Sequence, residues 1–128
     1  MLHGGLGSGK TTLVSEIVHS IGSSSPVSSP TFTLIHHYDH AFPIYHMDLY
    51  RMDTVDAIHY LDLDTYFNQQ DALIFVEWAD RLGPFYPKEY FKIELTLTSK
   101  KRTCLITAKG TTYQSRLKKS SLRTIKNL

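Results

Sequence analysis

The chain of 128 residues is 41% apolar, which is enough for one domain with a hydrophobic core and too little to divide comfortably into two. No apolar stretch approaches the ~20 residues of a membrane span, and the start lacks a basic region followed by an apolar core. The single cysteine, Cys104, excludes an internal disulfide framework and a CxxC metal or redox pair. These features favour a cytoplasmic protein without membrane attachment.

The net charge of +2 hides an asymmetry along the chain. Residues 1–94 hold all 12 acidic residues and five of the 14 Lys and Arg, whereas residues 95–128 hold the other nine basic residues and no acid. We therefore expect an acidic body with a basic end. Such an end can be a solvated tail, or it can attract nucleic acid or an acidic partner.

A glycine-rich segment near the start carries the strongest functional signal. Residues 4–11, GGLGSGKT, match the pattern G-x-x-x-x-G-K-[ST] at every fixed position and precede a predicted helix. Glycine torsions let successive backbone N–H groups turn inward at the positive end of a helix, which makes an anion-binding nest. Lys10 would reach the β and γ phosphates of a nucleotide, and the Thr11 hydroxyl would bind Mg²⁺.

The remaining elements follow from periodicity and turn residues. Residues 10–21 carry apolar side chains on one helix face, Gly22 supplies a stop, and residues 23–30 form a Ser- and Pro-rich loop. Residues 32–38 and 44–50 are predicted strands, a helix is expected from Thr54, and residues 72–76 form a buried strand. Residues 91–97 and 102–108 alternate as an antiparallel hairpin. Beyond Gly110, Leu117, Leu122, Ile125 and Leu128 are enough for a frayed helix.

Two carboxylates are candidates for a site that holds a triphosphate and Mg²⁺. Glu77 follows the buried strand, so its side chain would emerge at the edge of the sheet where open α/β folds bind ligands. Asp48 lies in a segment whose period of two puts His46, Asp48 and Tyr50 on one face. The alternatives are a solvated strand end for Glu77 and a structural hydrogen bond or ion pair for Asp48. The glycine loop favours the functional interpretation of both.

Four histidines, at positions 36, 37, 40 and 46, raise the question of a zinc site. Their spacing matches no standard site, no cysteine is near, and the adjacent pair would point to opposite faces of a strand. We do not predict a metal site there. The ring of Trp78 could stack on a base or cover the core, and both interpretations stay open.

Four motifs occur in a fixed order, namely GGLGSGKTT at residues 4–12, SPTFTL at 29–34, YHMDLYR at 45–51 and VEW at 76–78. Together they resemble the bacterial TsaE family, ATPases that support threonylcarbamoyladenosine synthesis in tRNA. The resemblance extends from about Leu2 to Ala108 and implies a P-loop NTPase-like α/β fold, a three-layer sandwich with a mixed sheet. It implies ATP hydrolysis with Mg²⁺ in a complex with TsaB and TsaD. We expect an ATPase domain over residues 1–110 and a basic tail over 111–128, which could contact tRNA.

The resemblance also implies roles for individual residues. Phosphate would be held by Gly7, Ser8, Gly9, Lys10, Thr11 and Thr12, and Mg²⁺ by Thr11 and Glu77. Thr31 would occupy the first switch, Asp48 would lie near the metal or the attacking water, and Trp78 would lie beside the nucleotide. Lys10, Asp48 and Glu77 are thus the expected catalytic residues. Lys101 and Arg102 are basic near the same edge, although they match the family pattern loosely.

Only three residues precede the loop, so the first strand of such a fold is cut to its last residues. Because buried aliphatic side chains contribute ~1.5–3 kcal/mol each, we expect either that Met1 is not the true start or that the chain is a weakened remnant. Two other functions are open at this point. The same loop serves small-molecule kinases, and a non-catalytic nucleotide-binding module would use it for assembly only.

Overall fold

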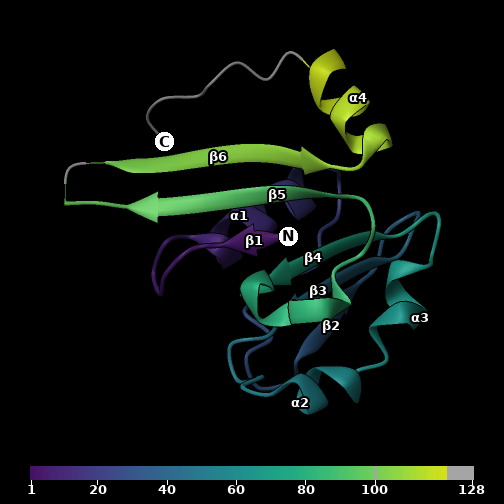
Figure 1. Cartoon of the computed structure of the whole chain (residues 1–128). Coiled ribbons are helices and arrows are strands. Elements are labelled where there is room, and N and C mark those ends of the chain that lie inside the picture. Colours follow the sequence, from purple (N-terminus) through teal and green to yellow (C-terminus); the bar gives the residue numbers. More distant parts are fainter. Residues whose placement is uncertain (100, 121–128) are drawn as a thin grey trace.

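The computed structural model describes residues 1–99 and 101–120, which contain a mixed six-stranded sheet (Figure 1). The strand order is β2-β3-β4-β1-β5-β6. The strands are β1 (Leu2–His3), β2 (Ile35–Tyr38), β3 (Ile44–Asp48), β4 (Leu73–Glu77), β5 (Tyr90–Leu97) and β6 (Arg102–Lys109). The predicted α/β class with a mixed sheet is confirmed.

The central strands run in parallel and place their carboxyl ends at one edge. Strand β1 is parallel to both β4 and β5, and β3 is parallel to β4. Outside them, β2 is antiparallel to β3, and β5 with β6 forms the predicted antiparallel hairpin. The glycine loop after β1 therefore opens beside the ends of β3 and β4, where Asp48 pairs in register with Glu77.

Helices cover both faces of the sheet. The described helices are α1 (Lys10–Ser20), α2 (Val55–His59), α3 (Leu63–Phe67), the 3₁₀ helix η1 (Ala79–Phe85) and α4 (Thr111–Lys119). Side chains alternate along β3 and β4, so that Ile44 and Phe75 pack with α1 residues, while Met47 and Val76 pack with α2, α3 and η1. Two cores on opposite sheet faces make the predicted three-layer arrangement.

The loop-to-helix prediction near the start is confirmed, and one strand prediction is partly wrong. Helix α1 ends at Ser20, with Gly22 in a left-handed conformation (φ 97°) just beyond it. Residues 32–34 are not in a strand, because residues 31–33 form a turn and Leu34 is left-handed (φ 67°). The Leu34 N–H donates to the Pro30 carbonyl at 2.6 Å, which closes the turn. Strand β2 therefore begins only at Ile35.

Two further predictions are corrected at their ends. Strand β3 stops at Asp48, so Tyr50 lies beyond the strand and not on its His46–Asp48 face. The expected helix from Thr54 forms as α2 but spans only five residues, with the Thr54 side chain accepting from the Ala57 N–H at 3.1 Å. Helix α4 forms after Gly110. Leu122, Ile125 and Leu128 lie outside the described residues.

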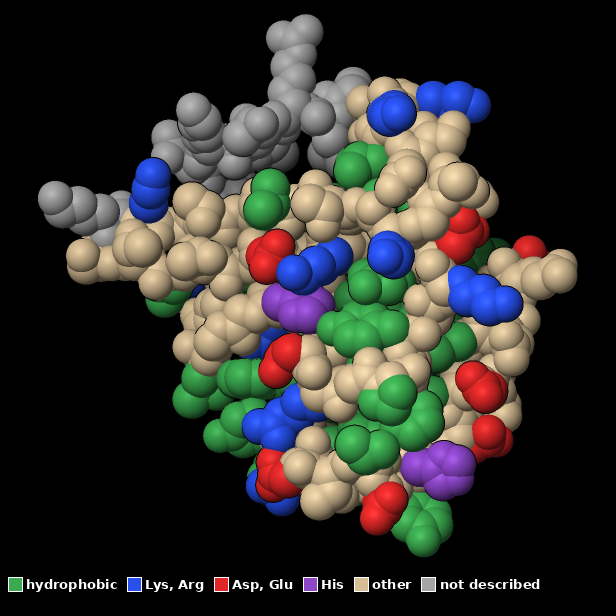
Figure 2. Space-filling view, viewed as in Figure 1, with side chains coloured by type: hydrophobic (Ala, Val, Ile, Leu, Met, Phe, Trp, Pro, Cys, Tyr) green, Lys and Arg blue, Asp and Glu red, His purple; other side chains and the backbone are tan. Residues whose placement is uncertain are grey.

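The charge asymmetry is visible on the surface. Figure 2 shows acidic side chains around α2 and α3, whose first turns carry Asp56 and Asp64. Helix α4 has no acid and carries Arg116, Lys118 and Lys119. None of the helices in the described part of the chain is long and apolar enough to span a membrane.

Candidate functional site: a phosphate loop facing two buried carboxylates

The glycine loop joins β1 to α1 in a tight turn. At Gly4 (φ 146°) a Cβ atom would lie 2.5 Å from the Leu95 carbonyl oxygen, so no side chain fits there. Gly9, left-handed at φ 101°, caps α1, and its carbonyl accepts from the Leu13 N–H at 2.9 Å. The loop therefore leads directly into the N-terminus of an 11-residue helix, which is the positive end of the helix dipole.

Lys10 is buried at the start of α1, and its ammonium lies within the loop. Its Nζ donates to the carbonyl oxygens of Gly4 at 2.7 Å and Gly5 at 3.0 Å. The ring of Trp78 covers it, with 4.1 Å between Nζ and the ring centroid. Burial lowers the pKa of Lys10, and the carboxylates of Glu77 and Asp48 oppose that shift. The ammonium is thus held where an anion bound to the loop would meet it.

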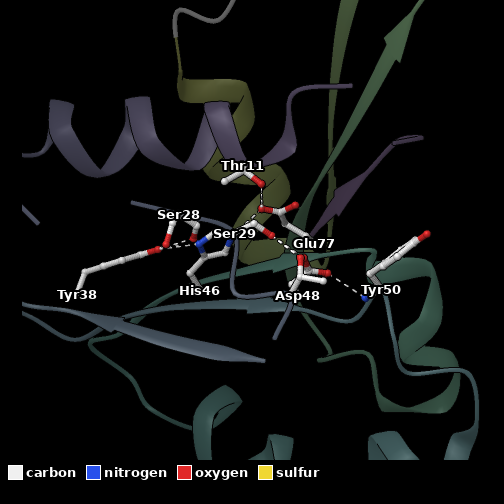
Figure 3. A network of polar contacts seen from close by, with 9 residues as sticks. Thr11, Ser28, Ser29, Tyr38, His46, Asp48, Tyr50 and Glu77 are labelled. Carbon is white, nitrogen blue, oxygen red and sulfur yellow. Dashed lines mark hydrogen bonds and ion pairs between the residues drawn. The ribbon is translucent and has the colours of Figure 1, made fainter. Parts of the chain in front are cut away.

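Glu77 ends β4 and reaches the first turn of α1. The Thr11 hydroxyl donates to Glu77 Oε1 at 2.7 Å, and His46 Nε2 lies 2.7 Å from the same oxygen (Figure 3). The side chain of Glu77 is only 4% exposed, so the carboxylate depends on these partners for its hydrogen bonds. The structure brings Thr11 and Glu77 together, as the sequence predicts for the two metal ligands.

Asp48, at the end of β3, forms hydrogen bonds to the Ser-Pro-Thr segment of residues 29–31. Its Oδ2 accepts from the hydroxyls of Ser29 at 2.9 Å and Thr31 at 2.7 Å. Its Oδ1 accepts from the backbone N–H of Tyr50 at 2.9 Å. The carboxylate therefore couples the segment around residue 31 to the sheet edge that holds Glu77.

His46 belongs to the site, although it is not among the site residues predicted from the sequence. It is fully buried between Glu77 and Tyr38, whose hydroxyl lies 2.9 Å from His46 Nδ1. Because a carboxylate only accepts hydrogen bonds, His46 donates its Nε2–H to Glu77, while the Tyr38 hydroxyl at Nδ1 also lies 3.4 Å from the Ser28 carbonyl. The signal that could have identified it is its position on the same strand face as Asp48.

The other three histidines of this group have no hydrogen bond to Glu77 or Asp48 among those between described residues. His37 stacks on Tyr45, and His40 contacts the Ile21 carbonyl and the ring of Phe42. His36 meets Tyr38 edge-on. Among the residues that the structure describes, no group of three or more His, Cys, Asp or Glu side chains could hold a metal ion by itself.

These residues line one cleft of about 390 Å³, within the range of small-molecule sites. Its walls are Leu6, Gly7, Gly9, Lys10, Thr11 and Thr12 from the loop and α1, together with Ser29, Thr31, Asp48, Tyr50, Glu77, Trp78 and Arg102. Nine of the ten predicted site residues therefore line the cleft, and the tenth, Ser8, is buried beneath the loop. Arg102, which matched the family pattern loosely, also lines the cleft.

The residues present suit a phosphate group and a hard metal ion. Arg102 Nε is buried without a hydrogen-bond partner among the described residues, and Arg102 lines the cleft, so it has free donor capacity there. The Thr11 hydroxyl and the Glu77 carboxylate are adjacent hard oxygen ligands, the kind that Mg²⁺ prefers. Donor groups and oxygen ligands thus occupy adjoining parts of one cleft.

Comparison with known proteins agrees with this geometry. The family model described as "Threonylcarbamoyl adenosine biosynthesis protein TsaE" matches residues 1–104. The chain belongs to the TsaE family. All four motifs and all predicted site residues lie within the matched range, whereas the whole of α4 and the rest of the basic tail lie beyond it.

Relatives of the family support the match at the level of sequence and fold. The chain is 39% identical over 115 residues to the tRNA threonylcarbamoyladenosine biosynthesis protein TsaE of Bacillus subtilis, covering 88% of this chain and 71% of the relative. It is 37% identical over 100 residues to that of a Nostoc strain, covering 75% of this chain and 60% of the relative. The crystal structure of Bacillus subtilis YdiB superposes with a TM-score of 0.73 at 32% identity, covering 91% of this chain and 72% of YdiB.

Proposed function

We propose that this TsaE-family chain binds ATP with Mg²⁺ and hydrolyses it as a component of the cytoplasmic machinery that makes threonylcarbamoyladenosine in tRNA. The observation that carries the proposal is the contact of Thr11 with Glu77 directly beside the buried ammonium of Lys10. A phosphate-binding loop, its lysine and two hard oxygen ligands meet there in one cleft. The names of the relatives support the tRNA pathway.

The chain's own residues divide the work as follows. The backbone N–H groups of residues 7–12, with the side chain of Lys10, would bind the phosphates. Thr11 and Glu77 would hold Mg²⁺, which when bound would withdraw charge from the phosphate oxygens. Asp48, which already holds Thr31, would orient the attacking water at the cleft. Trp78 would cover the bound nucleotide from the side of β4.

The proposed partners are TsaB and TsaD, with tRNA contacting the basic C-terminal region. Helix α4 supports this contact, because Arg116, Lys118 and Lys119 gather in its last turn without an acid on the helix. Phosphate release from ATP should not need an added acceptor molecule, and it should rise when TsaB and TsaD are present. ATP turnover that requires a metabolite acceptor, with phosphate transferred to it, would instead indicate a kinase.

The test of the site removes one charged group at a time. Lys10→Ala should abolish ATP hydrolysis, because each lost charge-assisted hydrogen bond to phosphate is worth ~1.5–3 kcal/mol. Glu77→Gln keeps a side chain that can bond to Thr11 and His46 but removes the charge that holds Mg²⁺. We expect it to abolish turnover and the Mg²⁺ dependence of nucleotide binding while the fold is retained.

The matched control is Glu16→Gln, since Glu16 is exposed on α1 outside the cleft. Turnover is followed by phosphate release, and folding by circular dichroism and thermal melting. Normal turnover in Glu77→Gln would move the metal role to another residue, with Asp48 the next candidate. Nucleotide binding without any hydrolysis by the wild type in the presence of TsaB and TsaD would favour a non-catalytic module.

A further inference from the structure

His46 reaches Glu77 across two paired parallel strands. In β3 and β4, Asp48 lies opposite Glu77, and His46 lies opposite Phe75. The His46 ring therefore meets the carboxylate diagonally, and its Nε2 lies 2.7 Å from Glu77 Oε1 (Figure 3). The His46 side chain has no exposed surface, and the Glu77 side chain is almost fully buried. Since water does not compete for this hydrogen bond, it restrains both side chains.

The two oxygens of the Glu77 carboxylate have different surroundings. Oε1 accepts from the Thr11 hydroxyl and from the His46 Nε2–H, both at 2.7 Å. Oε2 accepts from no residue within 1–99 and 101–120, yet it is not one of the buried side-chain atoms that lack a partner there. Because Glu77 lines the cleft, Oε2 is the oxygen that a ligand in the cleft can reach.

Two donors on one oxygen hold a carboxylate against rotation. The terminal torsion of a glutamate is broad and nearly two-fold, so a single donor allows the two oxygens to exchange places. Thr11 donates from α1 and His46 from β3, so the contacts come from two different elements. Removing a hydrogen-bond partner from behind a metal ligand typically lowers metal affinity about 10–100-fold. The His46 contact therefore has a direct consequence for a metal ion in the cleft.

We propose that His46 is a positioning residue that presents Glu77 Oε2 to the Mg²⁺ ion of the cleft by donating to Oε1. This inference rests on the proposed function, because it needs Glu77 to hold Mg²⁺ beside a nucleotide. His46 is not one of the residues that line the cleft, so it acts through Glu77. A role limited to filling the core would lower stability and leave the response to Mg²⁺ unchanged.

The experiment compares two amide side chains of different reach at position 46. In His46→Gln the amide N–H₂ can take the place of Nε2 and donate to Glu77, whereas in His46→Asn it reaches only the place of Nδ1. Calorimetry measures the affinity for the non-hydrolysable ATP analogue AMPPNP, in EDTA and over a series of Mg²⁺ concentrations.

His46→Asn should need about tenfold more Mg²⁺, or greater, to reach half of the gain in AMPPNP affinity that Mg²⁺ gives. Its affinity in EDTA should stay within about twofold of the wild type, because the glycine loop and Lys10 are unchanged. His46→Gln should need within about threefold of the wild-type Mg²⁺ concentration, since it restores the donor to Oε1.

The matched control is His37→Asn, the same substitution at an exposed position of the edge strand β2. Tyr38→Phe is a second control, because it removes the hydroxyl beside His46 Nδ1 and leaves the Nε2 contact. It should lower the melting temperature without changing the Mg²⁺ requirement. A wild-type Mg²⁺ requirement in His46→Asn would overturn the inference, as would equal losses in His46→Asn and His46→Gln.

Should the variants at position 46 fail to fold, the ring of the wild-type His46 decides. Nitrogen NMR must show a hydrogen on Nε2 that exchanges slowly with water. AMPPNP with Mg²⁺ must shift that signal further than AMPPNP in EDTA does. An Nε2 without hydrogen, or the same shift under both conditions, overturns the inference.

Failure of the underlying function gives a different result. A wild-type chain that does not bind AMPPNP, or whose affinity does not respond to Mg²⁺, would overturn the proposed function and the role of His46 with it. A wild type that responds to Mg²⁺, together with a His46→Asn variant that responds equally, overturns only the role of His46.

Discussion

Glu77 accepts two hydrogen bonds at a single carboxylate oxygen, from Thr11 and from His46. His46 is held in turn by the hydroxyl of Tyr38, and burial raises the pKa of that phenol. Three buried side chains from β2, β3 and β4 thus form one chain of hydrogen bonds that ends at Thr11. His46 fixes the direction in which Glu77 points.

Replacing His46 by alanine should lower the free energy of unfolding by ~1–3 kcal/mol, because Glu77 and the Tyr38 hydroxyl would lose a buried partner. The change is measured by urea denaturation. His37→Ala is the matched control, since His37 is exposed on the edge strand β2 and lies outside this chain of contacts. Equal stability of the two variants would contradict the role given to His46.

At the scale of elements, the segment from Ser29 to Leu34 is held to β3 from both ends. The hydroxyls of Ser29 and Thr31 bond to the Asp48 side chain, and the Asp48 N–H donates to the Leu34 carbonyl at 3.0 Å. Phe32 between them is 82% exposed and meets Arg51, with 4.3 Å between the guanidinium carbon and the ring centroid. The segment is therefore fastened by polar contacts and contributes little to the cores.

Thr31→Val should release this segment, because valine keeps the shape of threonine but cannot donate to Asp48. We expect faster amide hydrogen exchange at residues 31–34, with protection of β3 and β4 unchanged. The measurement is exchange followed by mass spectrometry or NMR. Thr33→Val, at an exposed position of the same turn, is the control and should exchange like the wild type. Wild-type exchange in Thr31→Val would show that Ser29 and the backbone suffice.

For the whole molecule, stability depends on the short strand at the centre of the sheet. Leu2 is fully buried in the core beneath α1, and β1 joins the β3–β4 half of the sheet to the β5–β6 hairpin. The Ile93 N–H donates to the Met1 carbonyl at 2.8 Å, which extends this junction. A substitution at Leu2 therefore weakens the link between the two halves as well as the core.

We expect Leu2→Ala to lower the free energy of unfolding by about 2–5 kcal/mol, the cost of deleting a buried leucine side chain. Urea or thermal unfolding measures the loss. Leu105→Ala, in β6 where Leu105 is 57% exposed, removes the same atoms and should cost less than about 1 kcal/mol. Similar losses in both variants would mean that the centre of the sheet contributes no more than its surface.

The elements that could be predicted from the sequence are those stabilised by interactions between residues close together in the chain. The loop, α1 and the β5–β6 hairpin were predictable because their glycines, apolar periodicity and alternation act between near neighbours. Residues 32–34 were not, because their β-prone side chains are overridden by the turn closed on Pro30 and by the bonds to Asp48. His46 looked like one of four clustered histidines; its place on the Asp48 face of the strand hinted at a role, but only the structure shows its burial against Glu77.

The sequence by itself determined the glycine loop, its helix and the residue types expected of a nucleotide site, since these depend on local backbone chemistry in consecutive residues. It also carried the ordered motifs that lead to the TsaE family. Only the tertiary structure decided that Thr11, His46 and Tyr38 form one chain with Glu77, and that Arg102 lies against Gly9. The physical reason is that strand order and register bring together side chains up to 93 positions apart, and no local pattern contains that information.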